Sequence, residues 1–505
     1  MSDPARNDED QPQSLAKTTL HGALWMTAGR FMKAPTNLLT VAILARLLTP
    51  ADFGVVAIGL VVIGLGAILV DGSFGMVLVQ RQKMDPPMIG ASLVLSLSLG
   101  TLFAVALLAG APLLERYFDF PHLTGVIRVL ALALPVSAAM AVTTALLQRA
   151  SRFGILTINS FLAQLLNAVV AISLAFSGFG VWSLVWGQFA QVCFETFLGF
   201  TALRSRYSIG FSLAALKDGF RSGGMFTLSK LFNWAGANID NVVVGTTLGA
   251  TSLGLYSRPS TLMNTVNQVI GTGTARVLFS TFAKMQHDLG RMRRAFERAL
   301  ATSLVAASFA AAFVLLFSNL IVHLMLGPKW VASVPIMQAL FAAFVTRSGY
   351  IVAEAVPLAL GLGRASAYRQ GAQFILVLAG AWLGSHFGVT GAAIGIAVAY
   401  WLFYLLCLLL VQQLLSVPWS KLVSMHLSAL AAIAVPVLAT IAIRYAMGSS
   451  PSLWSEVPPL FAFGASSLAV LAFAPAIILS DDIVRGRGHL VGLVGSRFGS
   501  AANAP

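Results

Sequence analysis

Charged residues are scarce in this chain, where Asp, Glu, Lys and Arg together supply only 10% of the 505 residues. A soluble domain carries about 25% charged residues, so this scarcity excludes a water-soluble fold. Hydrophobic residues make up 57% of the sequence, and the mean hydropathy is +0.84. The apolar residues extend along the whole chain, which indicates that the lipid bilayer is its solvent.

Cysteine and long hydrophilic segments are also nearly absent. Cys193 and Cys407 both lie in apolar runs, where a free thiol behaves as a small hydrophobe, so we expect no disulfide framework, no metal site and no cofactor. The longest hydrophilic stretches, about 204–222 and 282–297, are far shorter than a domain. The polar start at Met1–Gln13 does not have the pattern of a cleavable signal peptide. We therefore expect a membrane bundle without enzymatic activity.

Apolar segments of bilayer length recur along the chain. A bilayer core needs about 20 apolar residues per helix. Measured against this length, the sequence predicts an all-α polytopic membrane protein of about 14 transmembrane helices. The expected spans are 20–47, 53–79, 88–114, 123–148, 154–178, 181–203, 223–248, 253–281, 298–324, 331–360, 367–386, 389–413, 424–446 and 459–479.

Basic residues outnumber acidic ones and give a net charge of +14. They are dispersed among the apolar segments and do not gather on one domain, which argues against a nucleic-acid partner. With the N-terminus in the cytoplasm, they fall in every second loop, as the preference of Lys and Arg for cytoplasmic loops requires. The loops outside then hold only Arg46, Arg116, Arg128, Lys329 and Arg444. This pattern predicts a multi-pass protein of the bacterial inner membrane with both termini cytoplasmic.

An internal repeat appears when the chain is shifted by 200 residues. Thr27 then meets Thr227, Arg30 meets Lys230, and Phe53-Gly54 meets Leu253-Gly254. The shift spans an even number of helices, so the two halves are parallel repeats about an axis along the membrane normal. We expect two parallel six-helix lobes around a central cavity plus a C-terminal helix pair. The predicted parts are the tail 1–19, the N-lobe 20–203, a cytoplasmic linker 204–222, the C-lobe 223–413, the pair 424–479 and the tail 480–505.

Polar and basic residues interrupt several spans, and such residues usually face a cavity or a partner. Some follow the spacing of one helical face, as Arg30, Lys33 and Asn37 do. The alternative is that polar groups join helices, and that cations near span ends extend to the interface. The candidate cavity residues are Arg30, Lys33, Asn37, Lys230, Asn233, Arg258, Asn264, Asn267, Arg276 and Arg347.

Four acids lie within the spans, namely Asp71, Glu195, Asp240 and Glu354. They are candidates for an ion-coupling site, or else structural partners of the intramembrane cations. Cations outnumber acids in the spans, so the interior would attract an anion such as a pyrophosphate group. The glycines of span 53–79, Gly59 to Gly75, are expected mainly to allow close helix packing.

Two stretches carry a family resemblance, "ARLLTPADFGVVAIGLVVIGLGAILVDGSFGMVLVQR" at 45–81 and "NIDNVVVGTTLGATSLGLYSRP" at 238–259. Both resemble the polysaccharide transporter, or Wzx-type flippase, family, whose superfamily also contains MATE drug exporters and the lipid II flippase MurJ. The resemblance implies a central cavity that opens alternately to each side of the membrane. The cargo would be an undecaprenyl-pyrophosphate-linked oligosaccharide unit, moved outward for exopolysaccharide or lipopolysaccharide assembly.

The resemblance also implies roles and partners. The basic stripe would hold the pyrophosphate, amides and hydroxyls would hold the sugars, and the polyprenyl tail would stay among the membrane lipids. One of the four acids would couple transport to proton or sodium antiport. A polysaccharide polymerase and the export machinery would be further partners.

Three other interpretations stay open at the level of sequence. A MATE-like exporter of small molecules would share the fold, but the cationic interior argues against it. A MurJ-like lipid II flippase would differ only in its substrate. A membrane enzyme acting on lipid-linked donors would resemble proteins that have a long periplasmic loop, and no expected outside loop here is long.

Overall fold

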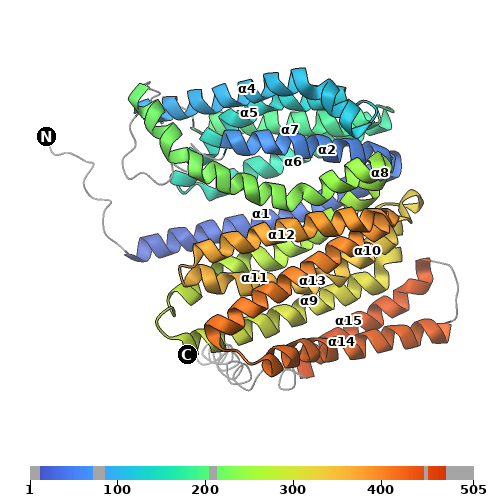
Figure 1. The fold of residues 1–505 in the computed structure, drawn as a ribbon. Helices are drawn as coiled ribbons and strands as arrows, with labels where there is room; N and C mark the ends of the chain where they lie inside the picture. Colours follow the sequence, from blue (N-terminus) through green and yellow to red (C-terminus); the bar gives the residue numbers. More distant parts are fainter. Residues whose placement is uncertain (1–11, 72–85, 204–212, 448–452, 474–505) are drawn as a thin grey trace, which may run out of the picture. The chain divides into compact units, whose positions relative to one another are not determined.

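The computed structural model describes residues 12–71, 86–203, 213–447 and 453–473. Within these ranges the chain forms α-helices and two short 3-10 turns, with no strand (Figure 1). It divides into two compact units. Unit 1 comprises Met1–Ser257 with Met325–Lys329, and unit 2 comprises Arg258–Leu324 with Trp330–Pro505.

Unit 1 is a bundle of long helices, of which α2 contacts α4, α5 and α7, while α6 contacts α1 and α7. Each expected span in the described part of this unit corresponds to a helix. Figure 1 shows α4, α5 and α7 running side by side. The helices are α1 (Pro12–Leu47), α2 (Pro50–Asp71), α4 (Pro86–Phe118), α5 (Leu123–Arg149), α6 (Phe153–Phe176), α7 (Val181–Leu203) and the first part of α8 (Leu213–Ala283).

Glycines bring α2 close to its neighbours. A Cβ at Gly59 would lie 3.1 Å from Val126, one at Gly64 would lie 2.8 Å from the Trp234 indole, and one at Gly66 would lie 2.5 Å from Phe103. These spaces are filled by the side chains of other helices, so the expected packing role of the span-two glycines is confirmed at these three positions. Gly72 and Gly75 lie outside the described residues.

The helical path of α8 covers two expected spans. It is interrupted at Gly249, whose φ of 83° and ψ of 176° lie in a region that essentially only glycine adopts. The break separates spans 223–248 and 253–281, as expected. The helix begins at Leu213, inside the predicted linker 204–222, because the Leu-Ala-Ala-Leu-Lys start is rich in good helix formers.

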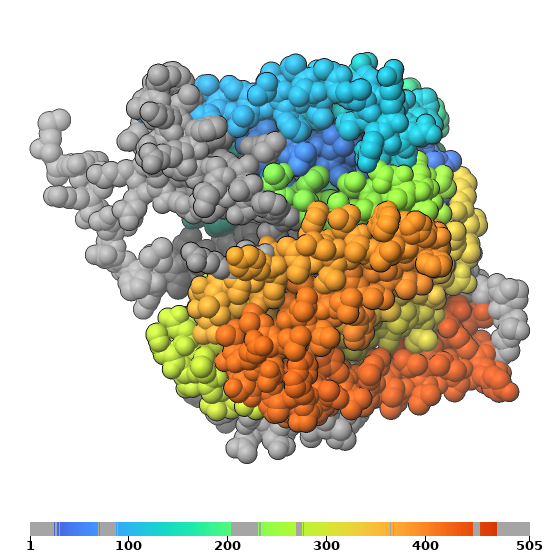
Figure 2. Space-filling model, in the orientation of Figure 1, coloured from blue at the N-terminus to red at the C-terminus, as the bar shows by residue number. Residues whose placement is uncertain are grey.

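Unit 2 contains the rest of α8 and seven further described helices. α13 contacts α10, α11 and α12, and α14 contacts α15. Figure 2 shows the later helices of this unit in orange to red. The helices are α9 (Leu289–Met325), α10 (Ser333–Ala342), α11 (Phe344–Ala359), α12 (Gly363–Ser385), α13 (Gly388–Leu415), α14 (Trp419–Met447) and α15 (Val457–Phe473).

The α9 helix starts nine residues before the expected span at 298. Its first turns are amphipathic, since Met292 and Phe296 are fully buried. Arg293 forms an ion pair with Glu297 at 2.9 Å, one helical turn away. The second half of the hydrophilic stretch 282–297 is therefore the first part of a helix of unit 2, and not a loop.

The α12 and α13 helices form a tight hairpin. Gly380 and Gly395 face each other so closely that a Cβ on either would overlap the carbonyl oxygen of the other, and Gly384 and Gly391 repeat this arrangement. Small residues four apart let two membrane helices approach backbone to backbone. Expected spans 367–386 and 389–413 thus form one closely packed element.

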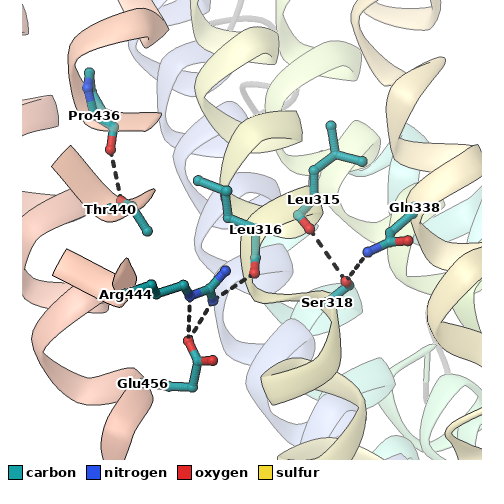
Figure 3. A network of polar contacts seen from close by, with 8 residues as sticks. All are labelled: Leu315, Leu316, Ser318, Gln338, Pro436, Thr440, Arg444 and Glu456. Atoms are coloured by element: carbon teal, nitrogen blue, oxygen red, sulfur yellow. Dashed lines mark hydrogen bonds and ion pairs between the residues drawn. The ribbon is translucent and has the colours of Figure 1, made fainter. Parts of the chain in front are cut away.

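The last two described helices, α14 and α15, contact α9 through polar and aromatic side chains. Arg444 of α14 binds Glu456 at 2.5 Å and donates to the carbonyl of Leu316 at 2.8 Å (Figure 3). Its guanidinium lies 5.1 Å from the centroid of the Phe317 ring, and Phe317 packs against Phe463 of α15. The predicted C-terminal pair is therefore an integral part of unit 2.

The composition of the helices fits a membrane protein. Among the described residues, eight helical segments are long and apolar enough to cross a bilayer. The all-α polytopic fold predicted from the sequence is thereby confirmed. The division into lobes at 204–222 stays a prediction. The eight segments are Pro50–Ile68, Ile89–Phe118, Leu123–Arg149, Phe153–Phe176, Leu289–Met325, Ser333–Ala359, Gly388–Leu415 and Trp419–Met447.

Candidate functional site

A polar cavity of about 330 Å³ lies in unit 1 among α1, α5, α6 and α7. Lys33 of α1 and Glu195 of α7 both line it, and their charges attract each other. Thr144, Gln148 and Ser160 supply further polar groups to its wall. Two charges and several hydrogen-bonding groups therefore share one cavity within the helical bundle.

Backbone contacts between α1 and α6 set the position of Lys33. Gly29 lies against Thr157, where an added Cβ would be 2.5 Å from the threonine methyl group. The Thr157 hydroxyl donates to the carbonyl of Trp25 at 3.3 Å, and the Gln164 amide donates to the carbonyl of Lys33 at 3.0 Å. The polar face of α6 thus holds the α1 segment that carries the lysine.

A cluster of amides joins α6 to α7 near this cavity. The Asn167 amide donates to Gln191 at 2.8 Å and to Gln188 at 3.5 Å. Our sequence analysis did not select the α6 residues Thr157, Gln164 and Asn167. Their spacing could have revealed them, because positions 157, 160, 164 and 167 follow one helical face and all are polar.

Electrostatics explains why Lys33 and Glu195 line the same cavity. A single charge placed among apolar helices is costly, and an opposite charge nearby offsets part of that cost. Lys33 therefore does not act as an isolated cation, as a purely basic stripe would suggest. A ligand that enters the cavity meets one cation, one anion and a set of neutral donors and acceptors.

Asp240, another predicted coupling acid, is held by fixed partners in unit 1. Its side chain is 6% exposed. It accepts hydrogen bonds from the Tyr256 hydroxyl at 2.6 Å and from the backbone amide of Asn241 at 2.9 Å. The hydrogen bond from Tyr256 connects the two parts of α8 on either side of the break at Gly249.

Glu354 lies in unit 2 and is bound by Arg369 at 2.7 Å and by the Ser366 hydroxyl. Both side chains of the ion pair are largely buried, at 10% exposed for Arg369 and 14% for Glu354. Arg369 lies in α12, within the expected span 367–386, and our sequence analysis did not select it as a candidate. The partner of this acid therefore comes from a neighbouring helix.

The remaining predicted cavity residues of unit 2 lie on α8 and α11. Arg347 places its guanidinium 5.2 Å from the centroid of the Tyr400 ring, a cation–π contact. Arg258, Asn264 and Asn267 are half-buried on the second part of α8. The side-chain amide oxygen (Oδ1) of Asn267 is buried without a hydrogen-bond partner among the described residues.

The other predicted residues are only partly described. Asn37 is half-buried on α1. The side chains of five candidates lie outside the described residues, so their roles stay predictions. These are Arg30, Asp71, Lys230, Asn233 and Arg276.

A second, larger cavity of about 810 Å³ lies in unit 2 among α9, α13 and α14. Apolar side chains such as Leu316, Leu402 and Leu427 form most of its wall. Its main polar groups are Tyr404 and His426, which hydrogen-bond to each other at 3.0 Å. The second His426 ring nitrogen lies 2.8 Å from the carbonyl of Leu422, so both nitrogens of the imidazole are engaged within the protein.

The described residues contain no group of three His, Cys, Asp or Glu side chains that could hold a metal ion. Long apolar helices with a charged cavity between them are typical of a multi-pass membrane protein of the transporter class.

Comparison with known proteins supports this class and specifies it. Residues 43–335 match the family model described as "Polysaccharide biosynthesis protein", and the chain belongs to that family. It is 27% identical to the succinoglycan biosynthesis transport protein ExoT of Rhizobium meliloti, over 65% of this chain and 67% of ExoT. It is 26% identical to the lipopolysaccharide biosynthesis protein WzxC of Escherichia coli, over 66% of this chain and 68% of WzxC.

A solved structure of the lipid II flippase MurJ, in an inward closed conformation, has a similar fold. The TM-score is 0.70 over 90% of this chain and 99% of MurJ, at 12% sequence identity. The membership predicted from the two quoted stretches is therefore confirmed, as is the relation of the fold to MurJ.

Proposed function

We propose that this protein moves a lipid-linked oligosaccharide from the cytoplasmic to the periplasmic leaflet for the assembly of a surface polysaccharide. The charged cavity of unit 1, in a chain of the polysaccharide biosynthesis family, is the observation that carries this proposal. The relatives ExoT and WzxC, named for succinoglycan transport and lipopolysaccharide biosynthesis, support it.

The chemistry of the cavity suits the polar end of such a lipid. Lys33 supplies a cation for a phosphate oxygen, and Gln148, Thr144 and Ser160 supply hydrogen bonds for phosphate or sugar hydroxyls. At about 330 Å³ the cavity accommodates one polar group and not a whole oligosaccharide. Undecaprenyl pyrophosphate is the carrier that this interpretation predicts, with its hydrocarbon tail among the membrane lipids.

Glu195 is our choice for the ion-coupling acid. It is the described intramembrane acid that lines the polar cavity, and it can exchange a proton or a sodium ion while Lys33 binds substrate. Asp240 and Glu354 instead have hydrogen-bonded partners that fix them in place. Asp71 is untested, because its side chain is outside the described residues.

The protein would act as a carrier in the inner membrane with both termini in the cytoplasm, and not as an enzyme. A polymerase and the export machinery would receive the transported unit. A MATE-like exporter and a lipid II flippase remain the competing functions, since a fold similar to that of MurJ does not distinguish between cargoes.

The test is deletion of the gene, followed by measurement of lipid-linked oligosaccharide in each leaflet and of surface polysaccharide. We expect the intermediate to accumulate in the cytoplasmic leaflet. Rescue should succeed with the wild-type gene and fail with Arg30→Ala, Lys33→Ala and Lys230→Ala. Normal intermediates and normal polysaccharide in the deletion strain would contradict the proposed cargo and favour a small-molecule exporter.

A further inference from the structure

Two helix breaks that are 200 residues apart in the sequence touch each other within unit 1. A Cβ added at Gly54 would overlap the carbonyl oxygen of Ala250, and a Cβ added at Gly254 would overlap the carbonyl oxygen of Pro50. The 200-residue shift exchanges the two contacts, since it relates Gly54 to Gly254 and Ala250 to Pro50. The two repeats therefore meet in a reciprocal contact, as two copies related by a two-fold axis do.

The contact consists of backbone on both sides. Each glycine Cα faces a carbonyl oxygen in the first turn of the opposite helix, a geometry in which each interaction is weak. Phe53 and Leu253 flank it and are 2% and 0% exposed. No larger residue than glycine fits at positions 54 and 254 while the two breaks remain together.

Each break is much more firmly held within itself than against the other. In the first repeat, Thr49 and Asp52 form a capping box, in which the Thr49 amide and hydroxyl donate to the Asp52 carboxylate at 2.9 and 2.7 Å. In the second repeat, the position that corresponds to Thr49 is Gly249, whose backbone conformation favours glycine. The hydrogen bond between Tyr256 and Asp240 spans this break. Two rigid turns that meet through weak backbone contacts can separate without unfolding, provided that the α2–α8 contact of Gly64 with Trp234 opens with them.

We propose that the reciprocal contact of Gly54 and Gly254 is the outer gate of the transporter. It is closed in this structure and breaks when the protein opens toward the periplasm, the side on which the distribution of basic residues places both breaks. This inference rests on the proposed transport function, because a carrier must close each side in turn. The glycines act by allowing closure and do not contact the cargo.

Spin labels at Ala51 and Thr251, each near one of the two glycine contacts, can report on the gate in nanodiscs. The labels require a protein with Cys193→Ala and Cys407→Ala. We expect a short-distance population in the parent, which falls at least fivefold in Gly54→Ala and in Gly254→Ala. The double variant should lose no more than either single variant, since both substitutions break one shared contact.

Gly110→Ala is the matched control, because a Cβ at Gly110 meets no atom within 4 Å. It should keep the distances of the parent. Two results would contradict the proposed gate. One is an unchanged short-distance population in Gly54→Ala, and the other is a loss of this population in the double variant that equals the sum of the two single losses.

A second measurement keeps both glycines and therefore avoids variants that fail to fold. Cysteines at positions 51 and 251, joined by a short reducible crosslinker, should stop transport of the lipid-linked cargo, and reduction should restore it. Continued transport by the crosslinked protein would contradict the proposal. The distance measurement needs no cargo, so a gate that moves in a protein without flippase activity would refute the proposed function and not the gate.

Discussion

The cavities of the two units differ in both size and chemistry. The cavity of unit 1 is about 330 Å³ and contains Lys33, Glu195 and several hydrogen-bonding groups. The cavity of unit 2 is about 810 Å³ and is walled mostly by hydrocarbon, with Tyr404 and His426 hydrogen-bonded to each other. The first suits an ionic or polar group, and the second suits a hydrocarbon chain.

The free-energy cost of placing a polar group differs between the two cavities. Burying a polar group without partners costs about 1–3 kcal/mol, so sugars and phosphates are disfavoured in unit 2. Unit 1 instead provides partners for them, at the expense of holding two charges within the bundle.

The largest expected effect comes from neutralising the charges of unit 1. Lys33→Met and Glu195→Gln should each lower transport more than tenfold, because substrate and coupling ion lose their charged partners. Each single variant should also lose about 1–3 kcal/mol of stability, since one charge remains without its counter-charge in a partly water-filled cavity.

The double variant Lys33→Met, Glu195→Gln should regain the stability but not the transport, which thermal unfolding and a flippase assay will separate. Lys421→Met, an exposed residue of α14, is the control and should leave both quantities unchanged. Transport by the double variant at the wild-type rate would show that the charges of the unit 1 cavity are not needed for transport.

A smaller effect is expected from filling the apolar cavity. Val423 lines it and is 52% exposed, so Val423→Trp adds bulk there without disturbing the buried core. If hydrocarbon enters this cavity, transport should fall severalfold at an unchanged melting temperature. Leu438→Trp is the control on the same helix, at a residue that is 65% exposed and does not line the cavity. Equal transport by the two variants would show that the cavity is not used.

The ion pair of unit 2 should matter for stability and not for transport. Arg369→Ala leaves the buried carboxylate of Glu354 without its cation and should cost about 3 kcal/mol of stability. The double variant Glu354→Gln, Arg369→Gln should recover most of that loss and transport normally. Loss of transport in the stable double variant would make Glu354 the coupling acid and weaken the choice of Glu195.

The smallest effect is expected at the end of unit 2. Arg444→Ala removes a partly exposed ion pair with Glu456 and a hydrogen bond to Leu316, for a loss of about 1 kcal/mol. Thermal unfolding of the purified protein should show a small decrease, with transport retained. A loss of transport without a change in stability would indicate that α14 and α15 take a direct part in function.

The sequence predicted the helices well, because bilayer length and the distribution of basic residues are strong constraints on a membrane chain. The 200-residue repeat also agrees with the reciprocal contact of Gly54 and Gly254. The early starts of α8 and α9 were not predicted, since their first turns are too polar to be recognised by hydropathy.

The site was harder to predict than the fold, since its members come together from different helices. Lys33 and Glu195 were both selected, but their proximity depends on how α1 and α7 pack against α6. The amides of α6 were missed because Asn, Gln, Ser and Thr are ordinary contact residues between membrane helices. The Glu354–Arg369 pair was missed because its two members lie on different helices, and spacing along the chain does not show which helices pack together.

Transfer of a lipid-linked oligosaccharide between leaflets of proteoliposomes tests the central claim most directly. The measurement uses a fluorescent polyprenyl-pyrophosphate oligosaccharide with the wild-type protein and with Lys33→Met, Glu195→Gln. We expect rapid transfer by the wild type, and transfer at least tenfold slower by the folded double variant. Equal rates for the two proteins, or no transfer above protein-free liposomes by the wild type, would contradict the assignment of the unit 1 cavity to the charged end of this lipid.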